Sequence, residues 1–229
     1  MMPDHTERNL TIDLGPDYGT VPALLLHPPE ARALLVLAHG AGAGMRHRFM
    51  EAIASALADR GIATFRYQFP YMEAGGGRPD SPKVLTATVR AAVAAASSVA
   101  PGLAVFAGGK SLGGRMTSTA DSQAPLPGVW GLIFLGFPLH APKRPGEARA
   151  DHLVQVQLPM LFLQGTRDDL AKLDLITGVC QRLGRRATLH VVQGGNHSFE
   201  VLKRSGRTNA EVLEELAETA VIWMDEVRI

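Results

Sequence analysis

The sequence has little cysteine and no excess of charge of either sign. A single cysteine, Cys180, excludes an intramolecular disulfide and a zinc site built from cysteines. Lysine and arginine number 23 against 22 aspartates and glutamates, so the net charge of +1 indicates neither a nucleic-acid nor an anionic-membrane partner. No spacing of histidines and carboxylates matches a metal-ligand pattern, and we expect no metal and no cofactor.

The sequence also lacks a long apolar run. One long uncharged stretch, residues 91–109, is mostly alanine and is interrupted by Pro101-Gly102, which indicates the end of a helix and then a strand, not a membrane span. Residues 1–8 contain no apolar signal-peptide core, so we expect a cytoplasmic location. With 229 residues, of which 46% are hydrophobic, the chain fits one domain, 1–229, with a sizeable core.

Apolar strand patterns alternate with amphipathic helix patterns along the chain. We predict strands at residues 10–13, 20–27, 33–38, 62–67, 103–107, 129–136, 160–164 and 188–192. We predict helices at residues 46–59, 83–100, 113–121, 170–183 and 208–227. The first two strands are expected at the sheet edge, where Pro22 is tolerated. This alternation predicts an α/β fold, with a mostly parallel central sheet of about seven or eight strands and helices on both faces.

Residues 103–115 combine an apolar strand, an abrupt turn and the start of a helix. The turn carries Gly109-Lys110-Ser111-Leu112-Gly113, a G-x-S-x-G pattern in which the serine occupies a strained strand-to-helix corner that exposes its hydroxyl. The flanking residues are glycines because side chains there would collide with the neighbouring strand and helix. A chain with 24 glycines can contain this short pattern by chance, so the preceding strand is what makes Ser111 a candidate nucleophile.

Two further strand ends supply partners for a serine nucleophile. Asp168 and His197 follow Ser111 in the order that nucleophile, acid and base have in this architecture, and each comes just after an apolar strand. Nucleophilic acyl chemistry needs a base to accept the serine proton and an acid to orient that base. Asp169 is the alternative acid, but it can instead cap the next helix, so we favour Asp168. The predicted triad is therefore Ser111, His197 and Asp168.

An oxyanion hole requires two backbone N–H groups near the nucleophile. The amide of Leu112, directly after the serine, is the first expected donor. The second is expected from the glycine-rich loop after the strand at 33–38, with Ala41 favoured and Gly42 as the alternative. The same loop is also typical of a tight strand-to-helix turn, and both interpretations can hold together.

Two nucleotide-binding interpretations fail on single residues. A phosphate-binding loop ending in the G-K-S of the turn would need glycine at position 104, which is Ala104. A dinucleotide fingerprint beginning at Gly40 and Gly42 would need a third glycine at position 45, which is Met45. The next strand ends in Gln68 without the carboxylate that would bind a ribose.

With these residues together, the chain resembles a compact α/β-hydrolase, and more narrowly the small, lidless members close to dienelactone hydrolases. It is also similar to the hydrolase-like domain of a subunit of the non-specific lethal chromatin complex. The resemblance is carried by residues 37–42, 65–71, 108–115, 165–168 and 195–199. It implies a serine hydrolase with Ser111 as nucleophile, His197 as base and Asp168 as orienting acid. True dienelactone hydrolases use cysteine as the nucleophile, so Ser111 argues against their substrate.

The resemblance leaves little chain for a lid. We expect the segments 69–82 and 137–158 to hang over Ser111 and shape an acyl pocket, although ordinary apolar packing is equally compatible with them. The candidate pocket residues are His39, Phe69, Tyr71, Phe137, Pro138 and Leu139. Arg66, Lys110 and Arg115 offer an anion-binding alternative to their structural roles.

Two functions from different classes follow from the sequence. The first is an esterase-type hydrolase that cleaves a small-molecule ester or related acyl substrate through an acyl-enzyme, and a thioesterase or peptidase would use the same residues. The second is a catalytically silent hydrolase fold used for binding or assembly. A fully buried Ser111, or an acid too far from His197 to bond it, would favour the second. No oligomeric state follows from the sequence.

Overall fold

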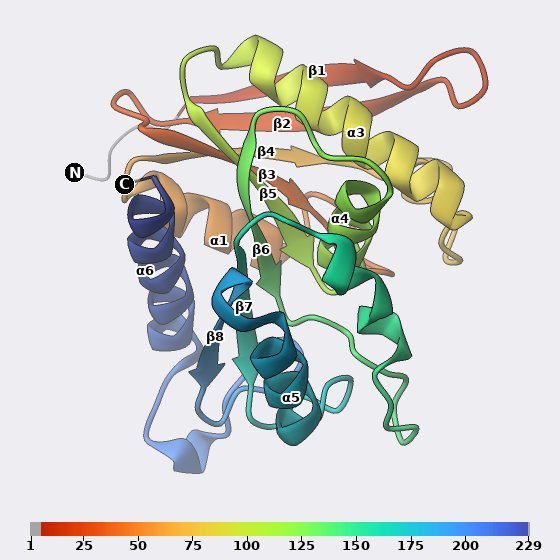
Figure 1. The fold of residues 1–229 in the computed structure, drawn as a ribbon. Coiled ribbons are helices and arrows are strands. Elements are labelled where there is room, and N and C mark those ends of the chain that lie inside the picture. Colours follow the sequence, from red (N-terminus) through yellow and green to blue (C-terminus); the bar gives the residue numbers. More distant parts are fainter. Residues whose placement is uncertain (1–5, 229) are drawn as a thin grey trace.

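A single eight-stranded sheet organises the described part of the chain (Figure 1). The computed structural model describes residues 6–228. Residues 1–5, which belong to the segment expected to contain no signal-peptide core, lie outside the described residues. The strands lie in the order β1-β2-β4-β3-β5-β6-β7-β8. They are β1 (Thr6–Asp13), β2 (Thr20–His27), β3 (Ala33–Ala38), β4 (Ile62–Tyr67), β5 (Ala104–Lys110), β6 (Val129–Leu135), β7 (Met160–Gly165) and β8 (Ala187–Val192).

Strand direction and burial agree with the apolar pattern of the sequence. Strand β2 runs antiparallel to both of its neighbours, β1 and β4, and all pairs from β4 through β8 in the sheet order are parallel. Every residue of β3, β4 and β7 is buried, because helices cover both faces of a parallel sheet. The prediction of a mostly parallel sheet is therefore confirmed.

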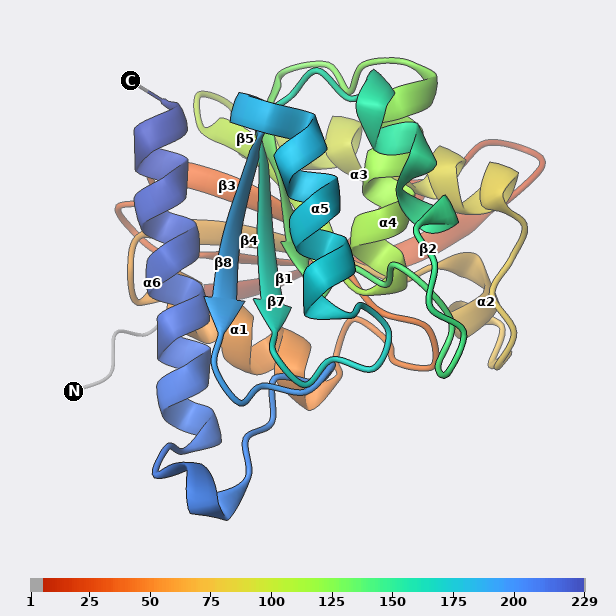
Figure 2. The same cartoon turned by 60° about the horizontal axis from the view of Figure 1, so that its bottom comes forward.

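The helices form one layer on each face of the sheet (Figures 1 and 2). Helices α1 (Arg48–Ala58) and α6 (Asn209–Val227) pack on one face, where Met50, Ile53, Leu216 and Trp223 belong to a common core. Helices α3 (Pro82–Val99), α4 (Leu112–Gln123) and α5 (Leu173–Leu183) cover the other face. In residues 6–228 no helix is both long enough and apolar enough to cross a bilayer.

The predicted edge position of β2 is wrong. The strand lies between β1 and β4, and only β1 is at that edge. The carbonyl oxygen of Pro22 accepts a hydrogen bond from the Gln68 amide (3.0 Å), so the proline faces β4. The proline nitrogen faces the same side, so pairing with β1 requires no N–H from Pro22, and toward β4 the proline lies one residue past the last paired position, Ala23.

Other predicted elements also differ from the structure. Strand β1 begins at Thr6, not at residue 10, and α5 (Leu173–Leu183) begins at Leu173, not at residue 170. Strand β5 continues past residue 107 to Lys110, because Gly108 and Gly109 pair with β3 on one side and with β6 on the other. The segment 69–82, predicted as a loop, contains the short helix α2 (Pro70–Glu73). The segment 137–158 contains a 3-10 helix, η1 (Ala148–Gln155). Glycine and proline occur both at chain turns and at positions of close packing within regular elements. Their presence in the sequence therefore does not distinguish a turn from a closely packed strand or helix.

Candidate active site

Ser111 lies at the sharp turn from β5 into α4. Its backbone angles, φ 51° and ψ −115°, lie in a region that costs a residue with a side chain about 1–3 kcal/mol. The glycines beside it are required by close backbone packing. A Cβ atom would lie 2.4 Å from the Ala38 carbonyl oxygen at Gly109, and 2.5 Å from the same oxygen at Gly113. The turn therefore holds the serine at the carboxyl end of the sheet, where adjacent loops can reach it.

A continuous hydrogen-bond chain joins the three residues predicted as a triad. His197 follows β8, and its Nε2 atom lies 2.8 Å from the Ser111 hydroxyl oxygen. The other ring nitrogen, Nδ1, lies 2.8 Å from Oδ2 of Asp168, in the loop after β7. With a carboxylate on Nδ1, the proton of the neutral ring lies on that nitrogen and leaves Nε2 free to accept the serine proton. The structure brings these groups together in the geometry that base-assisted attack requires.

The carboxylate of Asp168 is buried and held from three sides. Its Oδ2 atom also accepts a hydrogen bond from Nε2 of Gln164 (2.5 Å), and its Oδ1 atom accepts one from the Leu170 amide (2.8 Å). The alternative acid, Asp169, is exposed, and its predicted role as a helix cap is wrong because α5 begins at Leu173 with Lys172 at the N-cap. Of the two candidate acids, Asp168 is therefore the one that contacts His197.

Gln164 and Lys110 are site residues whose roles the sequence did not predict. The side chain of Gln164 also accepts a hydrogen bond from the Phe137 amide (3.0 Å), so it links the loops after β6 and β7. Lys110 donates a hydrogen bond to the His197 carbonyl oxygen (2.6 Å). A glutamine near the end of the otherwise apolar Met160–Gly165 run was the available signal for Gln164, because buried polar groups need partners.

The ammonium group of Lys110 lies between a backbone carbonyl and an aromatic ring. It stands 5.5 Å from the centre of the Phe199 ring and bonds a backbone carbonyl instead of a free anion. Burial lowers the pKa of Lys110 to about 8, and the negative charge of Asp168 opposes that shift. Of the three residues in the anion-binding alternative, Arg66 is buried in an ion pair with Glu7, which is a structural role.

A cavity of about 270 Å³ opens beside Ser111. Its lining residues are Gly40, Ala41, Gly42, Ala43, His47, Phe49, Met50, Lys110, Ser111, His197 and Ser198. Both candidates for the second oxyanion donor, Ala41 and Gly42, are among them. The other expected donor, the Leu112 amide, is the first of α4, where N–H groups have no acceptor within the helix and the helix dipole favours negative charge.

The predicted pocket walls do not line this cavity, which corrects that expectation. His39, Phe69, Tyr71, Phe137, Pro138 and Leu139 are all buried. Phe69, Tyr71, Phe137 and Leu139 belong to the core on the side of α3, α4 and α5. The segments 69–82 and 137–158 contribute no residue to the lining. Apolar side chains next to a strand end can face the core or a cavity, and here they face the core.

His39 joins two loops instead of contacting the cavity. Its Nδ1 atom donates to the Gly40 carbonyl oxygen (2.8 Å), and its Nε2 atom accepts a hydrogen bond from the Phe69 amide (3.0 Å). Burial lowers the pKa of His39 to about 4, while the bond to Gly40 opposes that shift. The ring is therefore neutral at neutral pH and carries its proton on Nδ1.

A serine at such a strand-to-helix turn, followed along the chain by an aspartate and a histidine at later strand ends, defines the α/β-hydrolase class. The chain belongs to this family, since the family described as "Alpha/beta hydrolase domain" matches residues 31–225. Among residues 6–228 no group of three or more histidine, cysteine or acidic side chains is arranged to hold a metal ion.

Solved structures with the same fold cover nearly the whole chain. A dienelactone hydrolase from Anabaena variabilis is 18% identical with a TM-score of 0.76, and the match covers 97% of this chain and 98% of that one. An α/β serine hydrolase without lid from Xanthomonas campestris is 20% identical with a TM-score of 0.73, covering 97% of each chain. Est1E from Butyrivibrio proteoclasticus is 18% identical with a TM-score of 0.68, covering 95% and 99%. The predicted resemblance to small, lidless, dienelactone-hydrolase-like proteins is confirmed.

Proposed function

We propose that the chain is a serine hydrolase of the carboxylesterase type, which cleaves an ester or related acyl bond through an acyl-enzyme on Ser111. The observation that carries the proposal is the hydrogen-bond chain from Asp168 through His197 to the Ser111 hydroxyl, beside an open cavity. Both features that would favour a silent binding module are missing from this site, because Ser111 lines the cavity and Asp168 bonds His197. The esterase and hydrolase names among the similar structures support the same class.

The proposed reaction runs in two halves. The Ser111 Oγ atom attacks the carbonyl carbon of the ester while Nε2 of His197 takes its proton, and the resulting oxyanion is stabilised by the amides of Leu112 and Ala41. The C–O bond to the alcohol then breaks, and His197 returns its proton to the departing oxygen. Water attacks the acyl-enzyme with the same base assistance and releases the acid. Asp168 holds the imidazole in the required tautomer and stabilises the imidazolium form.

The test compares wild type with Ser111→Ala, using a fluorophosphonate probe and p-nitrophenyl acetate. We expect the variant to lose labelling and at least a thousandfold in kcat, since removing the nucleophile leaves only binding and the oxyanion hole. Ser55→Ala, an exposed serine of α1 that does not line the cavity, is the matched control and should retain both. Equal turnover by wild type and the folded Ser111→Ala variant would refute the proposal.

A further inference from the structure

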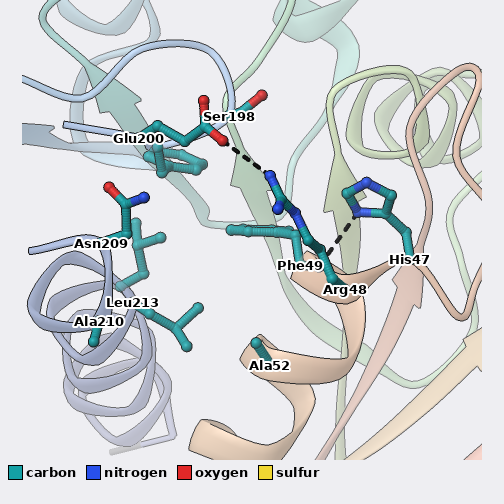
Figure 3. A pocket seen from close by; sticks show the side chains of 11 residues that line it. His47, Arg48, Phe49, Ala52, Ser198, Glu200, Asn209, Ala210 and Leu213 are labelled. Atoms are coloured by element: carbon teal, nitrogen blue, oxygen red, sulfur yellow. Dashed lines mark hydrogen bonds and ion pairs between the residues drawn. The ribbon is translucent and has the colours of Figure 1, made fainter. Parts of the chain in front are cut away.

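A second and larger cavity lies beside the first, between α1 and α6 (Figure 3). Its volume is about 430 Å³, within the range that binds small organic molecules. Its lining residues are His47, Arg48, Phe49, Ala52, Ser198, Phe199, Glu200, Asn209, Ala210, Leu213 and Leu216. They come from the first half of α1, the chain after His197, and the first half of α6.

The two cavities share part of their walls. His47, Phe49 and Ser198 line both the cavity beside Ser111 and the cavity between the helices. The ring of Phe49 is stacked on that of Phe199, with centroids 5.9 Å apart and planes inclined by 16°. A substrate bound at Ser111 would therefore reach the second cavity by extending past Phe49 and Ser198.

The chemistry of the second cavity suits an uncharged apolar group. Ala52 and Leu213 face each other across it from the two helices in Figure 3. The charged side chains at its rim, Arg48 and Glu200, pair with each other at 3.1 Å, so neither is left as a partner for an ionised ligand. The amide oxygen of Asn209 is taken by a hydrogen bond from the Val201 backbone (2.9 Å).

The order of the chain indicates which half of the substrate extends into this space. In the proposed reaction His197 must reach the departing oxygen to protonate it, so the leaving group lies on the imidazole side of the serine. Ser198, Phe199 and Glu200 follow His197 directly and line the second cavity. Resting on the proposed function, we infer that the cavity between α1 and α6 binds the alcohol half of the substrate ester, an uncharged alkyl or aryl group.

The kinetic test compares two ester series, acetates of alcohols from methyl to hexyl and methyl esters of acids from acetic to hexanoic. For wild type we expect kcat/KM to rise by about fourfold per methylene added to the alcohol, from the burial of each CH₂ group. Adding methylenes to the acid should not raise kcat/KM in this way. Ala52→Phe, which fills the cavity from α1, should reduce the hexyl-to-methyl acetate ratio at least tenfold, and Leu213→Phe repeats the test from α6. Ser55→Phe, one turn along α1 and exposed, should keep the wild-type slope.

A binding test separates this inference from the proposed chemistry. In the Ser111→Ala variant, 1-hexanol should raise the melting temperature, because a ligand that binds only the folded state stabilises it. Adding Ala52→Phe should abolish the rise. Two results would overturn the inference without affecting the proposed serine hydrolase function. One is a kcat/KM that rises with the length of the acid instead of the alcohol. The other is a hexanol stabilisation that neither Ala52→Phe nor Leu213→Phe reduces. Turnover that survives Ser111→Ala would instead overturn the proposed function.

Discussion

Replacing His39 with glutamine should make the fold less sensitive to acid. The imidazole is fully buried against the rings of Phe69 and Tyr71, with centroids 4.9 and 6.1 Å away. Its Nε2 atom accepts the Phe69 amide hydrogen and cannot do so once protonated. Glutamine keeps a side-chain oxygen that can accept from this amide but does not titrate. The variant therefore removes the proton-binding group without removing the means of satisfying the Phe69 amide.

The size of the effect follows from the pKa of His39. Burial lowers it from the ordinary value of 6.5 to about 4 in the folded protein. The unfolded chain therefore takes up a proton as the pH falls through 6.5, and the folded chain does so only near pH 4. Between pH 6.5 and pH 4, each pH unit by which the pH falls lowers the free energy of unfolding by about 1.4 kcal/mol. Above pH 6.5 this group does not affect the free energy of unfolding. Between pH 7.5 and 4.5 the loss due to His39 is about 2.5 kcal/mol.

The assay is equilibrium urea unfolding of wild type and His39→Gln at pH 7.5 and 4.5, followed by circular dichroism. The altered packing of the variant shifts its stability by a similar amount at both pH values, so the informative quantity is the difference between the two drops. We expect wild type to lose about 2.5 kcal/mol more than the variant over this interval. Equal drops would show that His39 titrates alike in the folded and unfolded chains, which would refute the account of its burial.

Two further predictions concern the groups around His197. Asp168→Asn should lower kcat by about 10⁴-fold. The carboxylate accepts hydrogen bonds from Gln164 and His197 at Oδ2 and from the Leu170 amide at Oδ1, whereas an asparagine side chain has only one oxygen that can accept. The exposed neighbour variant Asp169→Asn should stay within twofold of wild type, and an equal loss in both would contradict the assignment. Lys110→Met should lower kcat about tenfold by releasing the His197 carbonyl. Since the pKa of Lys110 is about 8, the kcat of wild type should also decline as the pH rises through 8. The Lys110→Met variant should not show this decline in kcat.

The sheet and the hydrogen-bonded residues Ser111, His197 and Asp168 could be predicted from the sequence because each depends on a local rule. The limits of β3 coincide with a continuous apolar run, and both end at Ala38, just before His39. Gly109 and Gly113 were expected beside Ser111 for steric reasons, and the structure shows the contacts that a side chain at either position would make with Ala38. Rules of this kind need no knowledge of which distant segments pack together.

The pocket could not be predicted because its walls depend on tertiary packing. Phe69 and Phe137 come directly after strand ends, as a pocket wall would, yet their rings pack edge-on against Tyr67 and Phe134 of the same core. The wall that the two cavities share comes instead from the start of α1 and from the chain directly after His197. Phe49 has the periodicity of an ordinary buried helix residue, so its position between two cavities left no separate signal in the sequence.

Polar residues at the ends of buried strands hold the loops of this site together. His39 follows β3 and bonds the loop after β4 through the Phe69 amide. Lys110 ends β5 and bonds the loop after β8 at the carbonyl of His197. Gln164, near the end of β7, bonds the loop after β6 and also Asp168. A buried polar side chain costs free energy unless it is hydrogen-bonded, and at a strand end the available partners are the adjacent loops. A polar residue that closes an apolar strand run therefore predicts which loops are held in fixed positions, even where the sequence does not identify its partner.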